Sequence, residues 1–155
     1  YSILRQRPGK DIIFDFEKSL SFEGDSGPYL QYTCVRAKSV LAKTKQSVEN
    51  EAGFQGSTLS TLKVEPLASF SASISFVEKL LYRFPEVVER AAAGYAPNYL
   101  VTYLTDLAAA FNSYYAANKI IGSEEETYRL ALTAAVAQVL ENGLNLLGIR
   151  VPVKM

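Results

Sequence analysis

The stretch that decides the fold is SEEETYRLALTAAVAQVLENGLNLLG, residues 123–148. It opens on Ser123 with Glu126 three residues later, the spacing of a capping box in which each side chain satisfies the other residue's backbone N–H. It closes on Gly148, placed where a glycine in the left-handed conformation commonly ends a helix. The sequence therefore predicts a helix from Ser123 to about Leu147.

Outward from this stretch, apolar residues recur at helical spacing along most of the chain. The first predicted segment is a short amphipathic turn with Ile13, Phe16 and Leu20. A helix over about 28–48 follows, capped by Asp25 or Ser26, and its apolar stripe is Leu30, Cys34, Ala37 and Leu41. The next helix covers 76–84 and is ended by Pro85, and its continuation over 86–93 is closed by Gly94 as a left-handed cap. A long helix over about 97–121 has a buried stripe formed by Leu100, Leu104, Leu107, Phe111 and Tyr114. Residues 50–66 are rich in Gly, Ser and Thr and predict a loop, and residues 10–14 are the only short strand candidate. We expect an all-α bundle of about five helices that forms a single domain over residues 1–155.

The composition excludes several classes of catalytic protein. The chain contains no histidine, which removes Ser-His-Asp and Cys-His catalysis and every His-containing metal site. It has no glycine-rich phosphate loop, and its 16 basic residues balance its 16 acidic residues. We expect neither catalytic nor metal-binding residues in this chain, and we interpret Glu124–Glu126 as negative charge at a helix N-terminus.

Two further observations bear on where the protein works. Cys34 cannot form an internal disulfide and lies on an apolar stripe, so we interpret it as a small buried residue. No apolar run approaches the ~20 residues of a membrane span, and residues 1–10 lack the apolar core of a signal peptide. We therefore expect a cytoplasmic protein without a membrane segment.

Two outward-facing groups of polar and aromatic residues are candidate binding surfaces. In the helix over 28–48, Tyr32, Arg36, Ser39 and Lys43 share a face that points away from the apolar stripe. A tyrosine one turn from an arginine suits a single-stranded nucleotide, because the ring stacks on a base and the cation meets phosphate.

The second group lies on the long helix over 97–121. There, Tyr115 lies off the buried stripe, on a flank with small Ala108 and polar Asn112, and Ala108 is expected to leave room beside the ring. The same residues are also consistent with an ordinary solvated helix face.

Several motifs together resemble the anticodon-binding domain of arginyl-tRNA synthetases. They are IFDFEKSLSFEGDSGPYLQY (13–32), FPEVV (84–88), YLTDLA (103–108), FNSYY (111–115), RLAL (129–132), VLENGLNLLGI (139–149), Pro152 and Met155. They follow one another over essentially the whole chain, interrupted only by the loop near 50–66.

The resemblance implies an all-helical domain of the DALR type, the C-terminal module of a class I aminoacyl-tRNA synthetase. In that family, the anticodon of the tRNA lies against two helices and the end of the chain. Carried over residue by residue, the anticodon contacts are Tyr32, Arg36, Tyr115 and Met155, with Gln31, Lys43 and Asn112 as further contacts.

The same resemblance implies partners and cofactors for the longer enzyme. Family members attach arginine to its tRNA using ATP and Mg, in an N-terminal Rossmann-type domain with HIGH and KMSKS signatures. Neither signature is present here, so the resemblance implies a non-catalytic fragment that begins after the catalytic domain.

The chain departs from the family pattern at three positions. Cys34 stands where the family often has histidine, Ala42 where some members have a basic residue, and Lys154 where arginine is common. Lys43 is our candidate to supply the charge missing at Ala42. An alternative interpretation is a helical protein-interaction module that uses Tyr32 and Tyr115 as contacts, since exposed tyrosines also favour protein interfaces.

Overall fold

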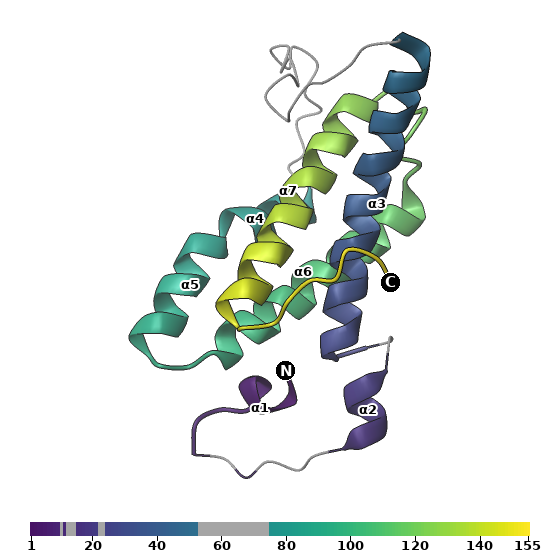
Figure 1. Cartoon of the computed structure of the whole chain (residues 1–155). Coiled ribbons are helices and arrows are strands. Elements are labelled where there is room, and N and C mark those ends of the chain that lie inside the picture. The colour runs from purple at the N-terminus through teal and green to yellow at the C-terminus, as the bar shows by residue number, and fades with distance from the viewer. Residues whose placement is uncertain (10, 12–14, 22–23, 53–74) are drawn as a thin grey trace.

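The computed structural model describes residues 1–9, 11, 15–21, 24–52 and 75–155, and its regular structure is entirely helical (Figure 1). The helices are α1 (Ser2–Arg5), α2 (Phe16–Leu20), α3 (Gly27–Ala52), α4 (Phe76–Tyr82), α5 (Phe84–Ala93), α6 (Asn98–Ala117) and α7 (Glu126–Leu146). The all-α prediction is confirmed. The five expected helices occur as α3 to α7, the predicted amphipathic turn forms α2, and α1 is an additional short helix.

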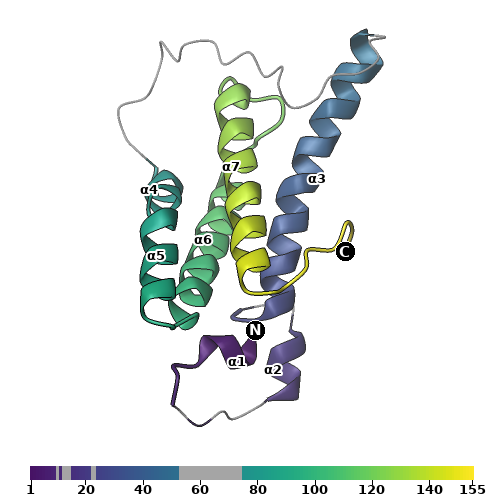
Figure 2. The same ribbon diagram turned by 60° about the vertical axis from the view of Figure 1, so that its left-hand side comes forward.

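The centre of the bundle is α6, which α3, α4, α5 and α7 surround (Figures 1 and 2). Its predicted stripe is buried, with Leu104, Leu107 and Phe111 fully covered and Tyr114 half-buried at the edge of the core. Where α6 meets α7, Gly143 faces Leu104 so closely that a Cβ at Gly143 would lie 2.5 Å from Leu104 Cδ2. The glycine therefore sets how near these two helices can approach.

Helix α3 begins where its capping residues predict. The backbone N–H of Tyr29 donates to Ser26 Oγ at 3.1 Å, and Pro28 lies in the first turn, where a missing N–H has no intrahelical partner to lose. The side chains of Leu30, Cys34 and Ala37 are fully buried, as the stripe predicts. The helix ends at Ala52, about one turn later than expected, so it includes the first residues of the segment predicted to be a loop. The rest of that predicted loop lies outside the described residues.

The two short helices α4 and α5 meet at Arg83, which ends the first and precedes the second. Ser75 begins α4 with a complete capping box: its hydroxyl accepts from the N–H of Glu78, and the Glu78 carboxylate accepts from the N–H of Ser75. Gly94 follows α5 but is not in the left-handed conformation, since its φ is −89°. The positive φ of 46° belongs to Tyr95, so the prediction of a left-handed cap at Gly94 was wrong by one residue.

The start of α7 differs from the prediction. Ser123–Glu125 form a turn, the helix begins at Glu126, and no side chain caps it, because the hydroxyl of Ser123 donates to the carbonyl of Ile120 instead. The carboxylate of Glu126 accepts from the N–H of Gly122 at 2.6 Å, one residue before the expected partner. The extra turn therefore separates the two halves of the predicted capping box.

The end of α7 is as predicted. Gly148 has φ +73°, the N–H of Ile149 donates to the carbonyl of Leu144, and the N–H of Gly148 donates to that of Asn145. These two bonds define a Schellman motif, which satisfies carbonyls that the helix leaves free.

The N-terminal residues lie across the end of the bundle nearest the beginning of α3 (Figure 2). The hydroxyl of Tyr1 donates to the carboxylate of Asp25, which also pairs with Arg5, and the same hydroxyl lies 3.0 Å from Thr105 Oγ1.

In α2, Phe16 and Leu20 are exposed, so the apolar side of this predicted amphipathic turn is not covered by the described residues. The strand candidate at residues 10–14 lies mostly outside the described part of the chain. None of the described helices is long and apolar enough to cross a membrane.

Candidate nucleic-acid interface

The packing of α3 against α6 brings the two predicted surfaces together into one cluster around Arg36. The Arg36 guanidinium donates from Nη2 to the Tyr32 hydroxyl and from Nη1 to Asn112 Oδ1, both at 2.9 Å. Its Cζ lies 4.6 Å from the ring centroid of Tyr32 and 5.6 Å from that of Tyr115. Both distances are within the range of a cation–π contact, so one cation joins two aromatic rings from different helices.

Asn112 fixes the position of this guanidinium. Its amide nitrogen donates to the Tyr29 hydroxyl and to Thr33 Oγ1, each at 3.0 Å, while its oxygen accepts from Arg36. All three contacts cross from α6 to α3. Because the amide is held on both sides, Asn112 supports the Arg36 side chain, and its contact with an anticodon stays a prediction.

The two tyrosine rings of the cluster are partly open to solvent. Tyr32 is 36% exposed and Tyr115 is 38% exposed, as expected for residues off the buried stripes. The ring centroid of Tyr115 lies 6.2 Å from that of Phe111, which is fully buried. Ala108 is also fully buried, and the expectation that it leaves room beside the Tyr115 ring stays a prediction.

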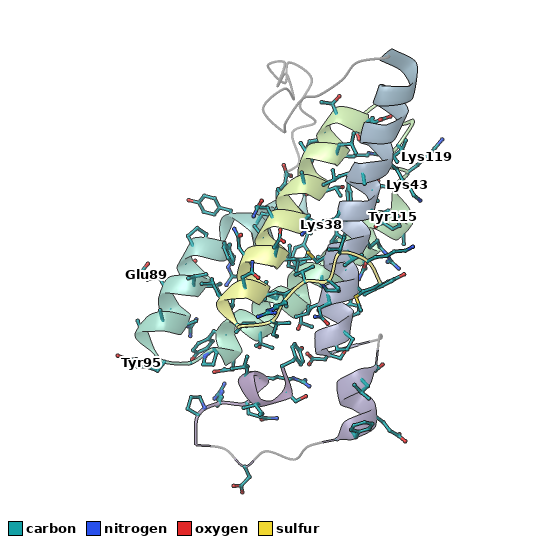
Figure 3. The ribbon with its side chains drawn as sticks, viewed as in Figure 1. Lys38, Lys43, Glu89, Tyr95, Tyr115 and Lys119 are labelled. Atoms are coloured by element: carbon teal, nitrogen blue, oxygen red, sulfur yellow. The ribbon has the colours of Figure 1, made fainter. Side chains whose placement is uncertain are left out.

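Further cations lie on the same side of the molecule. Ser39 and Lys43 are exposed on α3, as the predicted face requires, and Lys119 is exposed just after α6. Figure 3 shows Lys43, Lys119 and Tyr115 along one edge, on the α3 side. By contrast, Lys38 faces α7 and pairs with Glu141 at 2.5 Å, so its charge is compensated.

The C-terminal tail runs beside α3 in both views (Figures 1 and 2). The Gln31 side chain holds it, because Nε2 donates to the backbone carbonyl of Arg150 at 2.6 Å. Gln31 therefore fastens the tail, and its contact with an anticodon stays a prediction. Met155 is 45% exposed at the end of this tail.

The buried thiol of Cys34 has no chemical role in this cluster. It is fully covered, it donates to the carbonyl of Ala137 at 3.7 Å, and burial raises the pKa of the Cys34 thiol to about 11. A thiol with so high a pKa is protonated at neutral pH and is a poor nucleophile. The interpretation of Cys34 as a small buried residue is confirmed.

The sequence did not indicate Tyr29 and Thr33 as parts of the site. Both lie on α3 between the buried stripe and the outward face, and neither type nor spacing distinguishes them from ordinary helix residues. Tyr29 and Thr33 can be recognised as part of the site only in the folded structure, where their hydroxyl oxygens accept hydrogen bonds from the Asn112 amide. Lys119 was also missed, although the helix predicted over 97–121 places it one turn after Tyr115; in the structure it lies just beyond the end of α6.

Comparison with known proteins confirms the resemblance. The family model of the DALR anticodon binding domain matches residues 30–155. The arginine–tRNA ligase of Halothermothrix orenii is 38% identical over 149 residues, which are 94% of this chain and 24% of that protein. The arginine–tRNA ligase of Thermococcus kodakarensis is 37% identical over 157 residues, covering 100% of this chain and 24% of that protein.

A solved structure shows the same arrangement. The arginyl-tRNA synthetase of Thermus thermophilus superposes with a TM-score of 0.73 at 33% identity, covering 99% of this chain and 25% of that one. The chain thus spans about a quarter of the length of the relatives it matches.

Proposed function

Because the chain belongs to the DALR anticodon-binding domain family, we propose that residues 1–155 form one domain that binds the anticodon of a tRNA for arginine. It would do so as the C-terminal part of an arginine–tRNA ligase whose catalytic domain precedes it in the same chain. The proposal is supported by the relatives that match nearly all of this chain, because they are named arginine–tRNA ligases.

The observation that carries the proposal is the position of Arg36 between two exposed tyrosine rings. Unpaired bases of an RNA loop expose flat faces and hydrogen-bonding edges, which aromatic rings and guanidinium groups recognise. A base that stacks on Tyr115 or Tyr32 would lie beside a cation already held by Asn112. The remaining guanidinium N–H groups can donate to a base edge or to phosphate.

The charge around the rings suits the flanking backbone of the loop. Lys43 and Lys119 are exposed on the same edge as Tyr115, a placement that suits contact with phosphates. Met155, at the end of the tail fastened by Gln31, offers an apolar surface for a further base.

The chemistry of the longer enzyme would take place elsewhere in the protein. Among the described residues, no group of three or more acidic, cysteine or histidine side chains could hold a metal ion, and the chain carries neither the HIGH nor the KMSKS signature. We therefore propose that ATP, Mg and arginine bind to the preceding catalytic domain, and that the whole protein acts in the cytoplasm.

The test is the salt dependence of binding to an arginine tRNA by this chain. Each phosphate contact contributes about 0.7 to the slope of log affinity against log salt for a single strand. We expect Arg36→Ala and Lys43→Ala each to reduce the slope by about that amount. Arg36→Lys should keep the slope, because the charge remains, but should lower the affinity, because an ammonium group lacks the planar guanidinium that stacks on a ring and donates paired hydrogen bonds.

Lys79→Ala is the matched control, since Lys79 is exposed on α4 and lies outside the cluster. An arginine tRNA with a scrambled anticodon loop tests specificity and should bind more weakly. If both tRNAs bind equally, or if Arg36→Ala leaves the slope and the affinity unchanged, the anticodon assignment is wrong. The alternative of a protein-interaction surface would then be preferred.

A further inference from the structure

The amide of Asn112 meets a side chain of α3 whose hydrogen-bonding direction is already fixed. The Thr33 hydroxyl donates its single proton to the backbone carbonyl of Tyr29, one turn earlier in α3, at 3.0 Å. The Thr33 oxygen can therefore only accept from its other neighbour, and it accepts from Asn112 Nδ2 at 3.0 Å. Thr33 thus requires the nitrogen of the amide, rather than its oxygen, on its own side.

The orientation of this amide decides what it presents to Arg36. An asparagine side chain carries its donors on the nitrogen and its acceptor on the oxygen, so a nitrogen turned toward Thr33 directs Oδ1 away from it. There Asn112 Oδ1 accepts from Arg36 Nη1 at 2.9 Å. The reversed amide would direct N–H groups at a guanidinium that has only donors. Donation therefore runs in one direction, from Arg36 through Asn112 and Thr33 to the backbone of α3.

The second partner of the amide nitrogen does not impose a direction. The Tyr29 hydroxyl accepts from Asn112 Nδ2 at 3.0 Å. A tyrosine hydroxyl can donate as well as accept, so it would serve a reversed amide equally well. Of the two hydroxyl groups that meet Asn112, the one of Thr33 selects the orientation of the amide.

Thr33 lies too deep in the bundle to touch an RNA. Its exposed fraction is 0%, whereas Arg36 is partly exposed. A side chain that is already held in its binding conformation loses less conformational freedom when it binds a ligand. An influence of Thr33 on RNA binding would therefore pass through the guanidinium of Arg36.

We propose that Thr33 is a positioning residue for anticodon binding, which acts by fixing the Asn112 amide. The fixed amide holds the Arg36 guanidinium beside the rings of Tyr32 and Tyr115 before the RNA arrives. This inference rests on the proposed function, because it requires that Arg36 contacts the anticodon loop. It assigns a role in binding to a residue that no ligand can reach.

The test compares two substitutions of Thr33. Thr33→Val removes the hydroxyl and keeps the branched shape, and we expect it to weaken binding of an anticodon stem-loop RNA about 5-fold, the effect of one hydrogen bond. Thr33→Ser keeps a hydroxyl that can donate to the same carbonyl, so its affinity should stay within about 2-fold of the original. Equal losses in the two variants would overturn the proposal.

Thr133→Val is the matched control. Thr133 is also 0% exposed, and its hydroxyl donates to the carbonyl of Arg129, four residues earlier, at 2.7 Å. It lies on α7, outside the cluster around Arg36, so its substitution should change stability without changing RNA affinity. Equal effects of Thr133→Val and Thr33→Val on RNA affinity would mean a general effect of a disturbed core and would contradict the positioning role.

A double-mutant cycle shows whether Thr33 acts through the guanidinium. In the Arg36→Ala background, Thr33→Val should have no further effect on RNA affinity, because no guanidinium remains to be positioned. Asn112→Leu removes the amide from the same path and serves if Thr33→Val does not fold. It should weaken binding at least as much and should also lose its effect in the Arg36→Ala background. Additive losses would overturn the proposal.

A measurement without RNA separates this proposal from the proposed function. In the isotope-labelled chain, NMR follows rotation of the Arg36 guanidinium about its Nε–Cζ bond, which should be faster in Thr33→Val than in the original chain and in Thr33→Ser. Unchanged rotation in Thr33→Val would overturn the positioning role, even where Arg36→Ala weakens RNA binding. Faster rotation, with RNA binding that Arg36→Ala leaves unchanged, would instead overturn the anticodon assignment and with it the role of Thr33 in binding.

Discussion

Adjacent residues on α6 have opposite surroundings. Tyr114 packs at the edge of the core, and burial raises the pKa of its phenol, whereas Tyr115 projects toward Arg36 and is 38% exposed. The one-residue step turns the side chain by about 100° around the helix axis. Substitution at these two positions therefore separates a loss of stability from a loss of binding.

Tyr115→Ala should weaken binding of an anticodon stem-loop RNA by roughly 5- to 150-fold, the cost of one base-stacking ring. Its melting temperature should change little, because the ring is partly exposed. Tyr114→Ala should instead lower the free energy of unfolding by about 2–4 kcal/mol, since it removes a ring from the core edge. The measurements are RNA affinity and thermal unfolding for both variants, and a Tyr115→Ala variant that melts early would contradict the assignment.

Helical periodicity predicted which side each of these residues would face, but it did not predict what they would meet. The outward positions of Tyr32 and Arg36 on α3 and of Tyr115 on α6 follow from spacing alone. The bond between Arg36 and Asn112 depends on how α3 crosses α6, and residues 76 positions apart carry no local signal of it. The outward positions of Tyr32, Arg36 and Tyr115 were therefore predictable, whereas their meeting around one guanidinium and the supporting roles of Tyr29 and Thr33 were not.

At the scale of helices, two serines with the same spacing to a glutamate behave differently. Ser75 and Glu78 form a complete capping box at α4, whereas Ser123 and Glu126 do not. The spacing from serine to glutamate is the same at both helices. The difference is that residues 123–125 form a turn before α7, so Ser123 does not stand at the helix N-cap. Local sequence predicted the region in which α7 begins, while its exact first residue depended on how the preceding segment leaves α6.

Ser75→Ala should lower the free energy of unfolding by about 1 kcal/mol, because it leaves the N–H of Glu78 without its acceptor. Ser123→Ala should cost less than about 0.5 kcal/mol, since its hydroxyl only donates to one carbonyl in a surface turn. Urea unfolding of both variants compares them directly. A larger effect at Ser123 would mean that it caps α7 in solution.

The contact between α6 and α7 depends on the absence of a side chain at Gly143. Elsewhere in an exposed helix, a glycine-to-alanine change stabilises by roughly 0.5–1 kcal/mol. Here the added Cβ would lie 2.5 Å from Leu104 Cδ2, and Leu104 is fully buried with little freedom to move.

We therefore expect Gly143→Ala to destabilise the fold by about 1–3 kcal/mol, as overpacked cores do. The double variant Gly143→Ala with Leu104→Ala tests the cause, since removing the leucine branch makes room for the new methyl group. Chemical unfolding of the two single variants and the double variant should show less than additive losses. Additive losses would show that the two side chains do not interfere.

At the scale of the whole molecule, buried acidic groups make the fold sensitive to alkali. Burial raises the pKa of Tyr103 from 10.0 to about 12 and that of the Cys34 thiol to about 11, and it raises the pKa of Tyr1 as well. In each case the folded chain retains a proton that the unfolded chain releases at lower pH. Stability is therefore complete below the unfolded pKa values and falls as the pH rises through the folded ones.

We expect the free energy of unfolding to fall steeply between about pH 10 and 12, with Tyr103 contributing on the order of 2–3 kcal/mol. Tyr103→Phe provides the control. It loses the hydrogen bond to the carbonyl of Leu80 and should be less stable at pH 8, yet its stability should fall less between pH 10 and 12. Urea unfolding across this range measures both effects, and parallel curves for the two proteins would contradict the role of Tyr103.

The bundle as a whole was the most predictable level of this structure. The stripes of α3 and α6 bury the residues that their spacing indicates, and Gly148 ends α7 as its position predicts. Short segments were less predictable, because α2 leaves Phe16 and Leu20 exposed among the described residues despite their helical spacing. Periodicity shows which residues share a face, but only the neighbouring elements decide whether that face is covered.

The hydrogen bond from Gln31 to the carbonyl of Arg150 fastens the tail through a group that every residue type carries. The side chain at position 150 can therefore change without loss of this hydrogen bond, whereas a change at position 31 removes it and leaves the packing of Ile149 and Val151 to hold the tail. Over evolutionary time, such an anchor allows the last residues to vary in identity while they keep their place. The location of the tail therefore depends in part on α3, and the side chains at its end can change separately.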